Sequence, residues 1–143
     1  MNKIRGSVFV VAAVLILAAG ASWPLAAQET GAESLKPATW DALRAARVKA
    51  EELDNAGKFA EALQYHLEYT GIAERLGLPE FVAWGKNNSA YMIIKMHKQD
   101  KTVDLAPAKK LVEEGLAIPE ATEDCRRLLE SNLLYIKDFV EIE

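Results

Sequence analysis

The chain has 143 residues, of which 50% are hydrophobic and 27% are charged, with 17 basic and 21 acidic side chains. A net charge of −4 argues against a nucleic-acid-binding protein, because such proteins present a basic face. The chain has one cysteine, so no disulfide can form within it.

The N-terminal segment has the order of charge and hydrophobicity of an export signal. Two basic residues precede the apolar run 8–19, and small residues suited to cleavage follow at Ala21 and Ala27. We therefore expect residues 1–27 to be removed after one of these alanines. The protein would then be periplasmic or secreted, without membrane attachment. The alternative is an uncleaved membrane anchor, since the apolar segment nearly spans a bilayer.

The remainder of the chain predicts one helical domain. Cleavage removes two cations and no acids, which takes the net charge from −4 to −6. Residues 28–38 contain little to bury and predict a flexible linker. Residues 39–143 can bury about two-thirds of their surface as one domain. No stretch alternates apolar and polar residues as a half-buried strand does, so we expect an all-α fold.

Five helices are predicted from apolar residues at helical spacing. Their expected ranges are about 39–55, 58–76, 79–98, 105–118 and 122–140. Gly57 and Gly77 end the first two helices, and Pro79 suits the first turn of the third. Asp104 and Thr122 are the expected N-caps of the fourth and fifth.

The sequence has two further features: a distinctive joint between the first two helices and an internal repeat. In the segment 57–66, GKFAEALQYH, one helix ends at a glycine and the next begins at once. The repeat itself consists of three matching sets, one in each odd-numbered helix: Ala46, Ala50 and Leu53; Trp84, Asn88 and Tyr91; and Leu128, Asn132 and Tyr135. Small residues at such points let antiparallel helices approach closely, while large residues fill the space beside them.

These features resemble the tetratricopeptide repeat, whose unit is two antiparallel helices of about 34 residues. The resemblance covers residues 38–140 and is carried by GKFAEAL, Trp84, Ala90-Tyr91 and Pro119. It implies a short solenoid of two helical hairpins with a C-terminal capping helix. It also implies a non-catalytic module or scaffold that binds a protein or peptide. An ordinary antiparallel helical bundle is the alternative.

The resemblance further implies a concave groove lined by the odd-numbered helices. The residues expected there are Arg44, Arg47, Glu51, Lys86, Ser89, Arg126 and Glu130. Several inward-facing cations on an acidic protein would suit an acidic or C-terminal peptide segment. The alternative is a solvated helix face on which Arg44 and Arg47 pair with nearby acids.

Neither histidine predicts catalysis or metal binding. His66 lies on the apolar stripe of the second helix and is expected in the core, whereas His97 lies at the end of the third. No second His or Cys stands at ligand spacing from either. The chain has no glycine-rich phosphate loop and no nucleophile elbow. We therefore expect no catalytic residues, no metal and no cofactor.

Two further functions remain open. The fifth helix carries apolar residues on more than one side between 128 and 140, which suggests a self-associating structural protein of the cell envelope. Cys125 is either a small buried side chain or an exposed thiol that links two copies. A small-ligand carrier, with a pocket lined by Trp40, Trp84 and Tyr91, is the third possibility.

Overall fold

A computed structural model describes residues 37–140, and the predicted signal peptide and most of the predicted linker lie outside this range. The described residues form five α-helices and no strands. The helices are α1 Trp40–Asn55, α2 Phe59–Arg75, α3 Pro79–Gln99, α4 Ala106–Leu116 and α5 Glu123–Val140. The predicted all-α fold is confirmed, with helix ends shifted by about one or two residues.

The same backbone device ends α1 and α2. Gly57 and Gly77 adopt φ angles of +74° and +68°, a left-handed conformation that side chains with a Cβ rarely take. The residue after each glycine donates its N–H to a carbonyl in the last turn of the preceding helix, at 2.9 and 3.0 Å. These Schellman motifs satisfy carbonyls at the helix ends and let the next helix begin at once.

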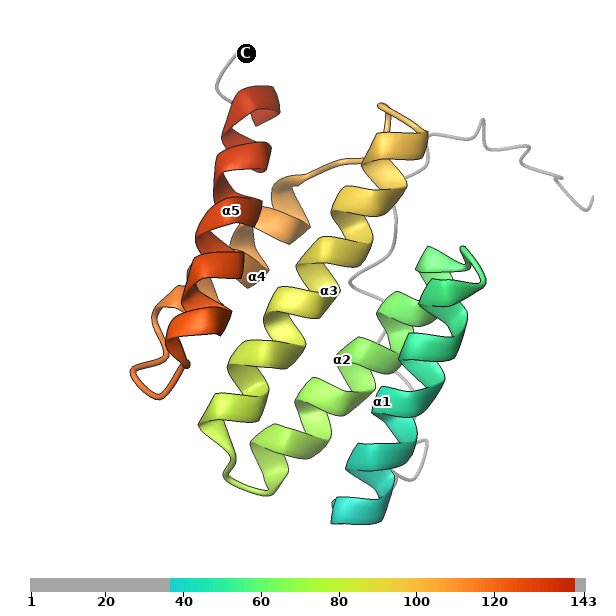
Figure 1. Ribbon diagram of the computed structural model, residues 1–143, viewed down its shortest axis with the longest axis vertical. Helices are drawn as coiled ribbons and strands as arrows, with labels where there is room; N and C mark the ends of the chain where they lie inside the picture. Colours follow the sequence, from blue (N-terminus) through green and yellow to red (C-terminus); the bar gives the residue numbers. More distant parts are fainter. Residues whose placement is uncertain (1–36, 141–143) are drawn as a thin grey trace, which may run out of the picture. The chain divides into compact units, whose positions relative to one another are not determined.

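Each helix packs against the next in chain order, and α3 also packs against α5 (Figure 1). The arrangement is consistent with the predicted stack of antiparallel hairpins. One apolar cluster centres on Leu43, Ile72 and Val82 and joins α1, α2 and α3. A larger one extends through α4 to α5 and includes Met92 and Leu129. The described core therefore consists of two clusters, and Ile118 packs against both.

Thr122 caps the start of α5 as the sequence predicts, whereas the N-cap of α4 is Leu105 and not the expected Asp104, which precedes it. Asp104 Oδ1 accepts a hydrogen bond from the N–H of Ala106 at 2.9 Å, and Thr122 Oγ1 accepts one from the N–H of Cys125 at 3.2 Å. Both pairings satisfy N–H groups that have no partner within the helix. None of the described helices combines the length and hydrophobicity needed to cross a membrane.

Candidate binding groove

A groove of about 690 Å³ is lined by the odd-numbered helices and by one residue of α2. Helix α1 contributes Glu51 and Asp54 and α2 contributes His66. The remaining lining residues come from α3 and α5: Asn87, Asn88, Tyr91, Met92, Ile94, Lys98, Leu128, Ser131, Asn132 and Tyr135. The lining is rich in amide and aromatic side chains.

Three asparagine side chains form a hydrogen-bonded chain between α3 and α5. Asn132 donates to Oδ1 of Asn87 at 3.0 Å, and Asn87 donates to Oδ1 of Asn88 at 3.1 Å. Within residues 37–140 this leaves a donor NH2 group at Asn88 and an acceptor oxygen at Asn132. Turning all three amides over only exchanges the two ends. The groove therefore offers one donor and one acceptor to an occupant.

Charge is divided unevenly along the groove. On the α1 side, Asp54 forms an ion pair of 2.6 Å with Lys95, and Glu51 pairs with Arg47 at 3.4 Å. On the α3 side, Lys98 has no carboxylate partner among the described residues. Its Nζ lies 4.9 Å from the ring centroid of Tyr135. This lysine is the cation of the groove that remains available to an anionic group.

His66 lines the groove and is 5% exposed. Burial lowers the pKa of His66 below its ordinary value, while the charge of Asp54 acts in the opposite direction. The ring is therefore neutral near pH 7. Its expected place on the buried face of the second helix is confirmed.

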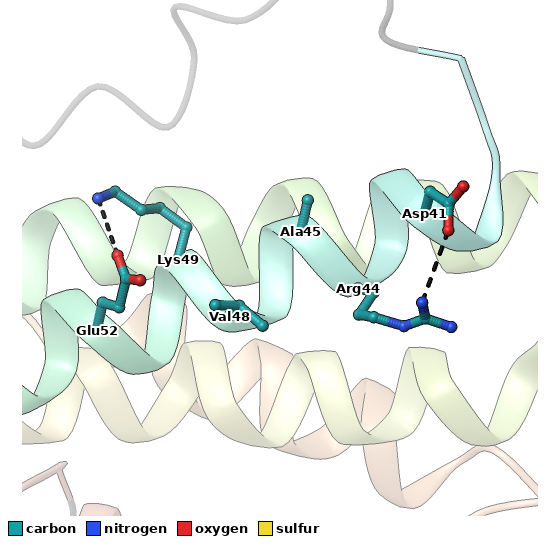
Figure 2. Close-up of a pocket in the computed structure, with 6 residues that line it drawn as sticks. All are labelled: Asp41, Arg44, Ala45, Val48, Lys49 and Glu52. Carbon is teal, nitrogen blue, oxygen red and sulfur yellow. Dashed lines mark hydrogen bonds and ion pairs between the residues drawn. The ribbon is translucent and has the colours of Figure 1, made fainter.

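Among the residues predicted for the groove, Glu51 alone contributes to its lining. Arg47 is exposed beside it as an ion-pair partner. Arg44 instead belongs to the far face of α1, where it pairs with Asp41 at 3.7 Å. Figure 2 shows this face, with a second ion pair between Lys49 and Glu52. A shallow pocket of about 420 Å³ lies there, lined by described residues of this one helix.

Three other predicted groove residues have structural positions, which corrects the prediction. Lys86 is directed toward neighbouring helices and forms ion pairs with Glu114 at 2.7 Å and Glu74 at 4.0 Å. Ser89 is fully buried. Arg126 donates hydrogen bonds to main-chain carbonyls at the end of α4 and in the turn after it, of which the shortest, to Ile118, is 2.6 Å. None of the three lines the groove, because each points toward the packed side of its helix.

The last predicted groove residue and the proposed carrier pocket also differ from expectation. Glu130 is exposed on α5 but is not part of the groove lining. Of the three aromatic residues proposed for a carrier pocket, Tyr91 lines the groove, whereas Trp84 packs against the core. Trp40 is 54% exposed and contacts Phe81 edge to face. The three aromatic residues therefore do not share one pocket.

The apolar residues of α5 are divided between different surroundings. Leu129 and Ile136 are fully buried in the core, and Leu128 lines the groove. Leu134, which is 67% exposed, is accompanied on the outer face by charged residues such as Arg127. Phe139 and Val140 are also exposed near the end of the helix, next to the exposed charges of Lys137 and Asp138.

Cys125 is completely buried in the first turn of α5. Burial raises the pKa of its thiol to about 11. Because the side chain is completely buried, the thiol of a second folded copy cannot reach it.

The groove residues that the sequence analysis missed include both asparagines of the internal repeat. The internal repeat predicts that Asn88 and Asn132, like Tyr91 and Tyr135, pack between helices, and Tyr91 is otherwise expected only in a carrier pocket. In the structure, these repeated positions line the groove. Repetition of a polar side chain at equivalent positions was the signal that could have identified them.

No protein-family model, curated protein or solved structure was found to match this chain. Membership of the tetratricopeptide family therefore stays a prediction. Within residues 37–140, no group of three or more His, Cys, Asp or Glu side chains is arranged to hold a metal ion.

Proposed function

We propose that this protein is an exported, non-catalytic interaction module that holds an extended peptide segment of a partner protein in the groove between α1, α3 and α5. The asparagine chain is the observation that carries this proposal. Its two ends present a donor and an acceptor, which is the pair that a peptide group needs for its own carbonyl and N–H.

The other groove residues support the same type of occupant. Tyr91 and Leu128 are about 40% exposed, and each offers apolar surface to a side chain. Lys98 can pair with an acidic residue of the peptide. The two acids that α1 contributes to the groove, Glu51 and Asp54, are already paired with Arg47 and Lys95, so the free cation is at the α3 side of the groove. The preferred peptide is therefore apolar with one acidic position.

A random-peptide library displayed on phage, selected on the purified protein, provides the test. Selected peptides are then measured by fluorescence anisotropy against Asn88→Ala and Asn132→Ala. We expect each substitution to weaken binding by about tenfold, since each removes one end of the amide chain. Asn55→Ala is the matched control because Asn55 is exposed at the end of α1, outside the groove.

Two results would contradict the proposal. One is a library selection that enriches no peptide above background. The other is a set of peptides whose affinity is the same for both groove variants and for the control. Circular dichroism of each variant checks that the helical fold is retained.

A further inference from the structure

A second cluster, at the far end of α3, surrounds a buried histidine. His97 lies in the last turn of α3 and is 6% exposed. Its Nδ1 lies 2.9 Å from the carbonyl oxygen of Val103. Because a carbonyl only accepts hydrogen bonds, Nδ1 carries the proton and Nε2 is left with a lone pair. That Nε2 is buried and has no hydrogen-bond partner.

Two aromatic rings from the last turns of α5 cover this histidine. The ring centroids of Phe139 and Tyr135 lie 4.9 and 6.2 Å from that of His97, and both contacts are edge to face. Phe139 is itself 42% exposed, so the cover is at the protein surface. The contact joins the end of α5 to the end of α3.

Lysines and aspartates both surround this corner. Lys98 lies over Tyr135 and Lys101 lies over Phe139, at 4.9 and 4.8 Å from the ring centroids. Asp100 and Asp104 lie in the loop after α3. The Asp100 carboxylate accepts two hydrogen bonds from Thr102, which lower its pKa, and the charge of His97 acts in the same direction to a smaller extent. On α5, the outward-facing Asp138 is exposed and no ion pair joins it to His97. None of these groups accepts a hydrogen bond from Nε2, so a proton there would create a buried cation without an acceptor at that nitrogen.

We propose that this corner is an acid-sensitive latch, in which protonation of His97 releases the last turns of α5 from α3. A buried imidazolium with no acceptor is unstable, and hydration restores its hydrogen bonds only when the rings move away. Tyr135 and Lys98 belong both to this corner and to the groove lining. Opening the latch therefore changes one wall of the groove. The inference does not require that the groove binds a peptide.

Amide hydrogen exchange at about pH 7.5 and about pH 5, corrected for the intrinsic rate at each pH, tests the latch on the full chain. In the wild-type protein, we expect amides of residues 135–140 to lose protection by about tenfold or more in acid. Amides of α2 and of the first half of α3 should keep theirs. NMR titration of the His97 ring should show the same midpoint as the loss of protection.

His97→Phe is the decisive variant, because it retains an aromatic ring beneath Phe139 but cannot take up a proton. We expect residues 135–140 of this variant to be equally protected at both pH values. His66→Gln is the control for titration of the other histidine, and its α5 should still open in acid. The proposal is overturned if wild-type α5 keeps its protection in acid, or if His97→Phe loses it to the same extent. The wild-type titration remains decisive even if the variant folds poorly.

Discussion

Lys95 of α3 forms an ion pair with Asp54 of α1, with 2.6 Å between Nζ and Oδ1. The two side chains are 23% and 25% exposed, so the pair is largely shielded from water. The ammonium group also lies 5.2 and 4.7 Å from the ring centroids of Phe59 and Tyr91. This one lysine therefore links α1, α2 and α3 beside the groove.

Replacing Lys95 with methionine should lower the free energy of unfolding by about 1–3 kcal/mol, because it leaves the Asp54 carboxylate partly buried and unpaired. Urea denaturation measures the change. Lys49→Met is the matched control, since Lys49 and Glu52 form a pair of 3.0 Å that is about half exposed. The control should leave the free energy of unfolding nearly unchanged, because water screens an exposed pair. Equal losses in the two variants would show that the Asp54 pair has no special role.

Gly85→Ala should destabilise the protein by about 1–3 kcal/mol, even though alanine favours helices. A Cβ at position 85 would overlap Thr70 Oγ1 and stand 3.1 Å from Tyr69 Cδ1, where α2 and α3 meet. Gly71→Ala is the opposite case, because a Cβ there meets no atom within 4 Å. That variant should gain about 0.5–1 kcal/mol from helix propensity. Thermal and urea unfolding distinguish the two signs, and a stabilised Gly85→Ala would refute the close approach.

Ser89→Ala should leave stability unchanged or raise it by up to about 1 kcal/mol. The hydroxyl of Ser89 is fully buried and has no hydrogen-bond partner, so its removal takes away an unsatisfied polar group. The substitution should also leave peptide affinity unchanged. A loss of more than about 1 kcal/mol would indicate that the hydroxyl makes a stabilising contact.

The free energy of unfolding should fall as the pH drops below about 6.5, in part because of His66. Burial lowers the pKa of His66 in the folded state, so the unfolded chain takes up a proton first as the pH falls. Protonation therefore favours unfolding, and this contribution to stability is present only above that range. Urea titrations across neutral and mildly acidic pH should give a smaller slope for His66→Gln than for the wild type. Identical slopes would mean that the pKa of His66 is the same in the folded and the unfolded state.

The sequence predicts the helices far better than it predicts the groove. Left-handed glycines at 57 and 77 and apolar residues at helical spacing are local signals, and the helices they predict are confirmed. The face that a helix turns toward a groove depends on its rotation, and each position is displaced by about 100° from the next. The sequence predicts Lys86 and Ser89 in the groove, whereas their neighbours Asn87 and Asn88 line it.

Arg126 illustrates a second limit of sequence reasoning. Its guanidinium group binds carbonyl oxygens between Leu116 and Ala121, in the turn that joins α4 to α5. This role depends on how that turn folds back over the start of α5. Charge and helical spacing alone cannot distinguish such a capping arginine from a ligand-binding one.

Because Cys125 is buried, the reactivity of its thiol reports when the first turn of α5 separates from its neighbours. It is the one thiol in the chain, and it lies in the first turn of α5, at the opposite end of the helix from Phe139. A thiol reagent added to the native protein can react only as fast as that first turn separates from its neighbours. Reaction at Cys125 therefore times the separation of the whole helix, whereas opening of the latch at the other end leaves the thiol protected. Fraying of α5 and its complete detachment can thus be followed separately in a chain that needs no engineered label.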